Sequence, residues 1–206
     1  MAASRYTSIL LFGVPGSGKG TQGAMLGRIP GFVHVAMGDV FRSLDRASEL
    51  GRKFLEYSTK GELVPDDLTL EIWRSHVEQL VADGRFRPNA EFLLLDGIPR
   101  SSAQAKSLAP FVEVTLVLHL EAQDLEQFVD RMRRRALQQK RPDDADEKVI
   151  RRRFEVYRAT TEPVLRAFDP KLVRSIEASG TPARVLLSIL EEVAPLQERR
   201  FPNPLG

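Results

Sequence analysis

The stretch GVPGSGKGTQ, residues 13–22, combines closely spaced glycines with a lysine and directly follows the apolar run SILLF at residues 8–12. Glycines let backbone N–H groups converge on phosphate oxygens, and the N-terminus of a following helix adds partial positive charge. Lys19 is long enough to reach the outer phosphates of a nucleotide. The alternative interpretation is an ordinary glycine turn between a strand and a helix. Because the lysine and the preceding run fit a phosphate site, the stretch predicts a phosphate-binding loop that joins a buried strand to a helix.

Further short apolar runs alternate with stretches of helical spacing along the chain. The other expected strands are FVHVA (32–36), FLLLD (92–96), VTLVLHL (114–120) and KLVRSIEA (171–178). Helical spacing is seen in Leu68, Ile72, His76 and Leu80, and again in Leu125, Phe128, Met132 and Ala136. Continuous apolar runs are typical of strands that are buried on both faces. The pattern predicts an α/β fold with three layers, in which helices cover both faces of a mostly parallel five-stranded sheet.

The composition limits the classes of protein to which the chain can belong. A chain of 206 residues with 42% hydrophobic and 28% charged residues suits a single globular domain. Lys and Arg number 30 against 28 Asp and Glu, and this small excess argues against a dedicated nucleic-acid binder. The absence of cysteine excludes disulfides and thiolate metal sites. No apolar run approaches the roughly 20 residues that cross a bilayer, and the first run lacks a cleavage site, so we expect no membrane association and a cytoplasmic location.

The glycine loop departs from the general P-loop pattern, since Gly20 stands where Ser or Thr usually follows the lysine. In this form the loop resembles that of the nucleoside monophosphate kinases, adenylate kinases above all. Other stretches recur in the order of that family: GDVFR (38–42), GELVPD (61–66), DGIPRSSAQ (96–104), DRMRRR (130–135), RPDDADE (141–147) and RRRFEVYRATTEPV (151–164). The resemblance runs from Gly13 to about Gly180.

The resemblance implies an enzyme that transfers a phosphoryl group reversibly from ATP to AMP with Mg²⁺, giving two ADP. The acceptor is an anionic phosphate oxygen at neutral pH, so positioning and electrostatics suffice and no general base is needed. This explains why no constellation of His, Ser or Cys nucleophiles stands out. The short lid lacks the insertion that carries cysteine ligands in some bacterial members, so no zinc is expected. The implied partners are ATP, AMP and ADP, and the implied state is a monomer.

The resemblance also implies roles for individual residues. The ATP site would comprise Gly16, Ser17, Gly18, Lys19, Gly20, Thr21, Arg131, Arg135 and Pro182. The AMP site would comprise Met37, Arg42, Leu63, Val64, Gly97, Arg100, Gln104, Arg141 and Arg153. The catalytic residues would be Lys19, Arg100, Arg135, Arg141 and Arg153. The ligands of Mg²⁺, through water, would be Asp39, Asp96 and Thr21.

Several of these assignments have alternatives. Asp39 also suits the N-cap of a helix. The spacing from RPDD leaves Arg152 as a substitute for Arg153 in contact with phosphate. A solvated basic face is the expectation for Arg133, Arg134, Arg151 and Arg152.

The identity of the acceptor also has alternatives. Gln104 matches the family's adenine reader. Met37 stands where adenylate kinases usually have Thr or Ser and pyrimidine-monophosphate kinases often have Ala, and Ile98 replaces the usual Phe of DGFPR. A kinase of UMP or CMP is therefore the alternative to an AMP kinase.

Two other classes of protein are less compatible with the sequence. A P-loop ATPase or GTPase would leave Arg100, Gln104 and the arginines of 131–135 without roles. A non-catalytic RNA- or nucleotide-binding module would usually interleave stacking aromatics with its basic residues.

For the architecture, the sequence predicts one kinase domain over 1–206, with an acceptor-binding insertion at about 36–70 and a lid at about 131–143. We expect a closing helix over 181–193, followed by a loose tail from residue 197. The three histidines, His34, His76 and His119, are expected to be packing residues.

Overall fold

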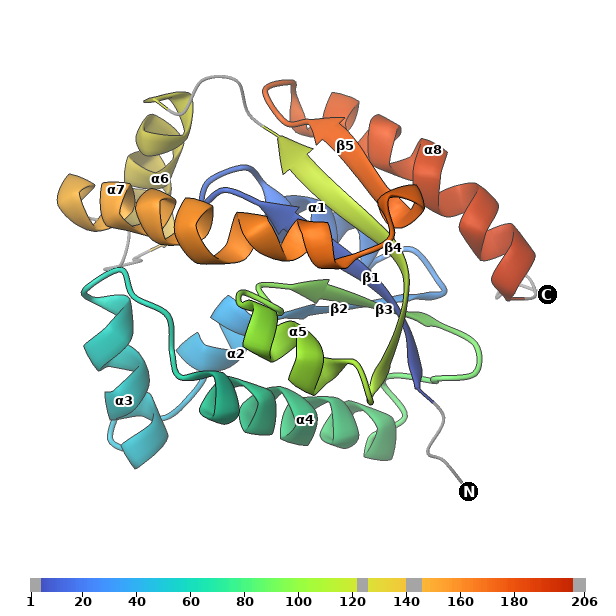
Figure 1. The fold of residues 1–206 in the computed structure, drawn as a ribbon, viewed down its shortest axis with the longest axis horizontal. Coiled ribbons are helices and arrows are strands. Elements are labelled where there is room, and N and C mark those ends of the chain that lie inside the picture. Colours follow the sequence, from blue (N-terminus) through green and yellow to red (C-terminus); the bar gives the residue numbers. More distant parts are fainter. Residues whose placement is uncertain (1–4, 122–125, 140–145, 202–206) are drawn as a thin grey trace.

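The computed structural model describes residues 5–121, 126–139 and 146–201. Its strands are β1 Tyr6–Gly13, β2 Phe32–Ala36, β3 Phe92–Asp96, β4 Val112–Glu121 and β5 Val173–Glu177. They form one sheet in the order β2-β3-β1-β4-β5, and all its pairings are parallel (Figure 1). All five expected strands are confirmed, and the sheet is wholly parallel.

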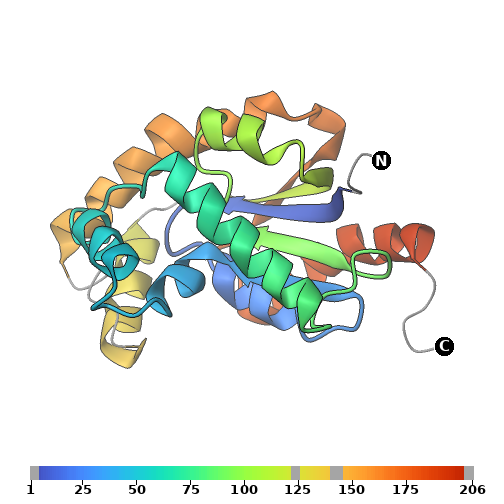
Figure 2. The same cartoon turned by 90° about the horizontal axis from the view of Figure 1, so that it is seen from below.

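Helices connect the strands and cover the sheet on both faces (Figures 1 and 2). The α-helices of the described chain are α1 Lys19–Leu26, α2 Met37–Arg42, α3 Glu49–Ser58, α4 Asp66–Ala82, α5 Ser102–Leu108, α6 Glu126–Gln139, α7 Glu147–Val156 and α8 Pro182–Arg200. Residues 157–167 continue α7 as a π-helical and then a 3₁₀-helical stretch. The three-layer α/β/α fold is confirmed.

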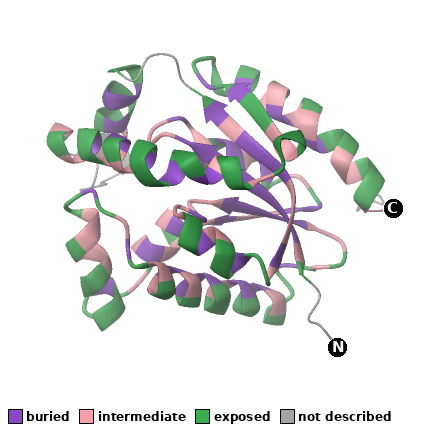
Figure 3. Ribbon diagram, viewed as in Figure 1, coloured by how far each residue is buried: buried purple, intermediate pink, exposed green. Residues whose placement is uncertain are grey.

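Two separate cores explain why the strand sequences are apolar without alternation. Ile9 and Leu11 of β1 belong to a cluster that includes side chains of α1, α6, α7 and α8, whereas Leu10 and Phe12 belong to a cluster with α4 and α5. Successive residues of a strand point to opposite faces, so a strand that is covered on both sides is apolar at most of its positions. Figure 3 shows the resulting band of buried residues along the strands.

The last helix is longer than the sequence pattern indicated. α8 continues through Pro195 to Arg200, so the expectation of a loose tail from residue 197 is wrong for residues 197–200. Gln197 Nε2 donates to the carbonyl oxygen of Pro30 at 2.8 Å, and the Phe201 ring lies 4.8 Å from the Phe92 ring. These contacts with the body of the protein stabilise the final turns and offset the backbone hydrogen bond that a proline removes from a helix.

The helices of the expected insertion and lid lie on the side of the sheet where the strands end. α2 and α3 follow β2, and α6 and α7 lie before and after residues 140–145, which are outside the described residues (Figure 1). In parallel sheets, the loops beyond the carboxyl ends of the strands converge to form ligand sites. Within the described residues, no helix has both the length and the apolar character needed to cross a membrane.

Candidate active site

The glycine loop connects β1 to α1 as the sequence predicts. Gly18 caps α1 with φ +96°, a left-handed conformation in which glycine is favoured. Ser17 N–H donates to the carbonyl oxygen of Val14 at 3.1 Å and tightens the turn. The Ser17 hydroxyl oxygen is buried and has no hydrogen-bond partner among the described residues. An unpaired buried hydroxyl beside a helix N-terminus fits a site that receives an anion.

Lys19 lies along the same loop. Its ammonium donates to the carbonyl oxygens of Gly13 at 2.6 Å and Val14 at 3.0 Å. Burial lowers the pKa of Lys19 to about 8; nearby arginines, Arg100 foremost, add to this effect and Asp96 opposes it. Burial thus makes the charged form of Lys19 unfavourable in the free protein. A bound polyanion would offset this cost, so the arrangement is the one expected at a polyphosphate site.

Asp96 ends β3 next to the loop. Its Oδ2 lies 3.9 Å from His34 Nε2, which is too long for a hydrogen bond. Burial alone would raise the pKa of the Asp96 carboxyl, but His34, Lys19 and Arg100 together hold it below its ordinary value. A Cβ built at Gly20 would lie 3.6 Å from Asp96 Oδ2, so the helix start leaves room beside this carboxylate. An ionised, partly open carboxylate next to a phosphate loop fits a water-mediated Mg²⁺ site.

Asp39 has a different environment. It lies in the first turn of α2, whose N-cap is Ala36, so the N-cap hypothesis for Asp39 is wrong. The Asp39 carboxylate accepts a hydrogen bond from Arg42 at 2.6 Å. Thr21, the remaining expected Mg²⁺ ligand, is exposed in the first turn of α1.

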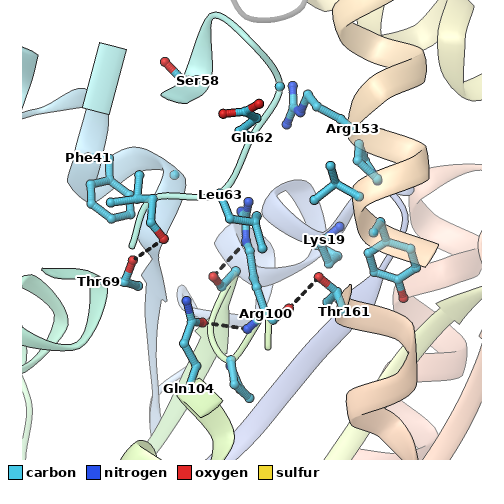
Figure 4. A pocket seen from close by; sticks show the side chains of 18 of the residues that line it. Lys19, Phe41, Ser58, Glu62, Leu63, Thr69, Arg100, Gln104, Arg153 and Thr161 are labelled. Carbon is cyan, nitrogen blue, oxygen red and sulfur yellow. Dashed lines mark hydrogen bonds between the residues drawn. The ribbon is translucent and has the colours of Figure 1, made fainter. Parts of the chain in front are cut away.

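A pocket opens between the loop and the expected insertion, with about 1040 Å³ of empty space that includes its open mouth. Its lining includes seven residues that the resemblance assigned to the acceptor: Arg42, Leu63, Val64, Gly97, Arg100, Gln104 and Arg153. Lys19 lines the same pocket. Figure 4 shows Lys19 of α1, Arg100 of the loop after β3, Gln104 of α5 and Arg153 of α7 around this pocket. Segments far apart in the sequence thus bring a donor-side lysine and acceptor-side arginines to one space.

Arg100 and Gln104 are tied to each other in this pocket. Arg100 N–H donates to Gln104 Oε1 at 2.7 Å, and Arg100 Nε donates to the carbonyl oxygen of Gly97 at 2.9 Å. Gly97 has φ +85°, and a Cβ there would lie 2.9 Å from the Arg100 guanidinium. The turn at Gly97 therefore favours glycine, and the Arg100 guanidinium lies close against it.

Arg152 and Arg153 of α7 lie differently with respect to the pocket. Arg153 is half-buried and lines it. Arg152 is exposed and pairs with Glu155 at 3.1 Å. Of the two alternatives, the structure brings Arg153 to the site.

Other basic residues of this region form ion pairs on the surface. Arg133 pairs with Glu147, and Arg151 pairs with Glu126 at 2.9 Å. Together with the exposed Arg152, they match the solvated basic face that the sequence suggested.

The expected donor-base residues lie near the loop. A Cβ at Gly18 would lie 3.6 Å from Arg131 Nη2, and the Arg131 guanidinium lies 5.5 Å from the centre of the Phe128 ring. Arg135, one turn further along α6, contributes to the low pKa of Lys19. The carbonyl oxygen of Pro182, at the start of α8, accepts a hydrogen bond from Gln22 at 3.0 Å.

Two of the residues that the resemblance assigned to the acceptor are not among those that line the pocket. Met37 is 1% exposed, belongs to the core and is not among the lining residues. Arg141 lies outside the described residues, as does the rest of 140–145.

Several lining residues were not assigned from the sequence. Phe41 and Phe54 stack at 5.2 Å, and Tyr157 and Thr161 come from the π-helical stretch. The Thr161 hydroxyl donates to the carbonyl oxygen of Arg100 at 2.9 Å. The signal in the sequence that could have found Tyr157 and Thr161 is the stretch RRRFEVYRATTEPV, in which both lie.

The expectation for His119 was incomplete. Its Nε2 lies 3.2 Å from the Tyr157 hydroxyl, and its Nδ1 lies 3.2 Å from Glu121 Oε1. The residue therefore takes part in hydrogen bonding as well as in packing. Among the described residues, no group of His, Asp and Glu side chains is arranged to hold a metal ion by itself.

Comparisons with known proteins agree with this geometry. The sequence model of the adenylate kinase family matches residues 11–173. The adenylate kinase of Flavobacterium psychrophilum is 35% identical over 181 residues, which cover 84% of this chain and 91% of that protein. The adenylate kinase of Thermus thermophilus is 35% identical over 88% of this chain and 94% of that protein. The adenylate kinase of a Synechococcus species is 38% identical over 84% of this chain and 91% of that protein. Because the family model matches most of the chain and these relatives are at least 35% identical over more than four fifths of it, the chain belongs to the adenylate kinase family.

Proposed function

We propose that the chain catalyses the reversible, Mg²⁺-dependent transfer of a phosphoryl group from ATP to AMP, giving two molecules of ADP. The observation that carries this proposal is that Lys19 of the phosphate loop lines the same pocket as Arg100, Gln104 and Arg153. A site that joins two phosphate-binding regions in one space suits transfer between two nucleotides. A hydrolase would need room and positioning for water instead.

The acceptor oxygen is itself the nucleophile, so the protein's task is to hold two anions in line and to compensate their charge. Arg100 and Arg42 bind the phosphate of AMP, because guanidinium forks match phosphate oxygens in pairs. Lys19 and Arg135 bind the phosphates of ATP. Arg153 stabilises the charge that develops on the transferred group.

Binding of the donor phosphates relies on the loop from Gly16 to Thr21, with Arg131 and the Pro182 carbonyl beside the donor base. Asp96 would help to hold Mg²⁺ through water, and the ion would supply positive charge beside the phosphates of ATP. The Asp39 carboxylate, paired with Arg42, orients that arginine in the structure and is the weaker Mg²⁺ candidate.

We assign the acceptor-binding insertion to about residues 36–70 and the lid to about 131–143, with Arg141 as a further phosphate contact. Closure of these parts over the nucleotides excludes water, which would otherwise compete with AMP for the phosphoryl group. A monomeric state and a cytoplasmic location remain predictions from the sequence.

A coupled phosphotransfer assay tests this function, with ATP and Mg²⁺ and with AMP, CMP, UMP or GMP offered separately. Strong preference for AMP is the expected result. Preference for CMP or UMP would make the protein a pyrimidine nucleotide kinase on the same scaffold. Absence of transfer to every acceptor would overturn the proposal.

A further inference from the structure

The side-chain amide of Gln104 has only one chemically sensible orientation. The residue lies in the first turn of α5, is 2% exposed and lines the acceptor pocket. The backbone N–H of Arg100 can only donate, so the atom 2.7 Å from it must be the amide oxygen. The amide nitrogen then faces Asp66, and the distance from Gln104 Nε2 to Asp66 Oδ1 is 2.7 Å. The two neighbours therefore define which end of the amide is which.

Asp66 is itself held in place by α5. It begins α4, and its second oxygen accepts a hydrogen bond from the Ser101 hydroxyl at 2.7 Å. Ser101 caps α5 by accepting from Gln104 N–H at 3.0 Å. The carboxylate thus bridges the start of α4 to the start of α5, and each of its oxygens has one donor. Asp66, which lies 38 positions before Gln104 in the sequence, thus fixes the orientation of the Gln104 amide.

These bonds leave Gln104 with one N–H and one oxygen lone pair that are not used by the protein contacts described above. Adenine presents a ring acceptor, N1, beside an exocyclic amino donor, and the free N–H and lone pair match that order. Hypoxanthine and guanine present the opposite order, a ring N–H beside a keto oxygen. They would be matched only by an inverted amide.

Inverting the amide is costly in this setting. It would place the NH₂ group against the Arg100 N–H and the amide oxygen against the Asp66 carboxylate. Two hydrogen-bond donors would then face each other at Arg100, and two acceptors would face each other at Asp66, around the buried side chain of Gln104. Repulsion of this kind discriminates between ligands more sharply than an added attraction does.

We propose that Asp66 is a positioning residue for acceptor specificity: it locks the Gln104 amide so that the pocket takes a 6-aminopurine monophosphate and rejects a 6-ketopurine monophosphate. The inference rests on the proposed function, because the amide order matters only if the pocket receives the base of the acceptor. The inference adds Asp66 to the residues that determine acceptor specificity. Asp66 contacts no substrate and acts through Gln104.

AMP and IMP are the probes of choice, since they have the same size and differ only in the order of donor and acceptor on this edge. The ratio of kcat/KM for AMP to kcat/KM for IMP is measured with ATP and Mg²⁺. For the wild-type enzyme we expect a ratio of at least roughly 100, as for other sites built to hydrogen-bond their substrate. Asp66→Ala should lower this ratio at least tenfold through a higher KM for AMP, with KM for ATP unchanged.

Two variants separate positioning from mere helix stability. Asp66→Asn should preserve the ratio, because its amide oxygen can still accept from Gln104 while its NH₂ donates to Ser101. Asp67→Ala removes the neighbouring exposed carboxylate from the same first turn of α4 and should leave the ratio unchanged. Ser101→Ala removes the donor to the second Asp66 oxygen and should lower the ratio in the same direction, which provides a test if Asp66→Ala does not fold.

The outcomes are distinguishable. If Asp66→Ala or Ser101→Ala keeps the wild-type ratio and loses only thermal stability, Asp66 has a structural role and the inference fails. If Asp67→Ala lowers the ratio as much as Asp66→Ala, negative charge at the start of α4 is responsible and not the fixed orientation of the Gln104 amide, so the inference fails. If the wild-type enzyme transfers no phosphoryl group to AMP, the proposed function fails first.

Discussion

The ammonium of Lys19 donates to the carbonyl oxygen of Gly13 at 2.6 Å, so the cation of the phosphate loop is held by the loop's own backbone. Burial, assisted by nearby arginines and opposed by Asp96, lowers its pKa to about 8. A lysine carries its charge below its pKa, so the free enzyme should lose this cation as the pH rises through 8. Bound phosphates would favour the charged form and move that loss to higher pH.

The pH dependence of catalysis should therefore differ between the free and the substrate-bound enzyme. We expect kcat/KM for ATP to fall above pH 8, approaching tenfold per pH unit, and kcat to decline only at higher pH. Rates measured from pH 6 to 10 at varied ATP check this. Lys19→Met, which cannot titrate, should be far less active and should lack the step near pH 8. A wild-type kcat/KM that stays flat to pH 9.5 would contradict the assignment.

Arg100 should matter for transfer more than for folding. Arg100→Ala removes the guanidinium but keeps the backbone N–H to Gln104 and the carbonyl that accepts from Thr161. We expect a loss of about 3 kcal/mol of transition-state stabilisation with little change in melting temperature. Arg100→Lys should recover only part of the loss, since an ammonium cannot bind phosphate as a fork. Near-normal turnover of Arg100→Ala in a steady-state assay would remove Arg100 from the mechanism.

Adjacent arginines of α7 offer a matched pair. Arg153 lines the pocket, whereas Arg152 is exposed and pairs with Glu155. Arg153→Ala should lower kcat at least roughly 100-fold, because a cation near the transferred group is lost. Arg152→Ala should stay within about twofold of the wild type, since exposed ion pairs contribute little. Equal effects of the two substitutions, measured at saturating ATP and AMP, would show that the phosphate contact is misassigned.

The central strands could be predicted because they lie between two cores. Burial on both faces requires continuous apolar runs such as FLLLD, and such runs bounded by turns stand out in a sequence. The end of α8 could not be predicted in this way. Pro195 and the polar residues after it suggest a helix end, whereas contacts of Gln197 with Pro30 and of Phe201 with Phe92 continue the ordered structure.

The residues of the site also differ in how far their roles could be predicted from the sequence. Lys19, Arg100 and Arg153 could be assigned because they lie in contiguous motifs, each of which carries several family residues. Asp66 also lies in such a stretch, GELVPD, but its role could not be assigned, because its contact with Gln104 joins two helices and neither stretch alone shows it. Thr161 is a similar case, since its bond to the Arg100 carbonyl depends on tertiary packing alone.

Met37 shows how burial can resolve a departure from the family pattern. It is 1% exposed, starts α2 and packs in the cluster that contains Phe41 and Trp73. Met37→Thr should lower the free energy of unfolding by about 2 kcal/mol, because it removes core volume and introduces a hydroxyl into the core. The preference for AMP over CMP should persist, since Gln104 and not residue 37 lines the pocket.

Denaturant unfolding of Met37→Thr and the acceptor assay check these two expectations separately. Gln104→Ala is the positive control, because it removes the amide expected to read the base and should lower the preference for AMP sharply. A shift of Met37→Thr toward CMP or UMP as large as that of Gln104→Ala would mean that position 37 contacts the base in the closed enzyme. Unchanged selectivity with reduced stability would make Met37 a core residue, whose size is set by packing between α2 and α4 and not by the acceptor.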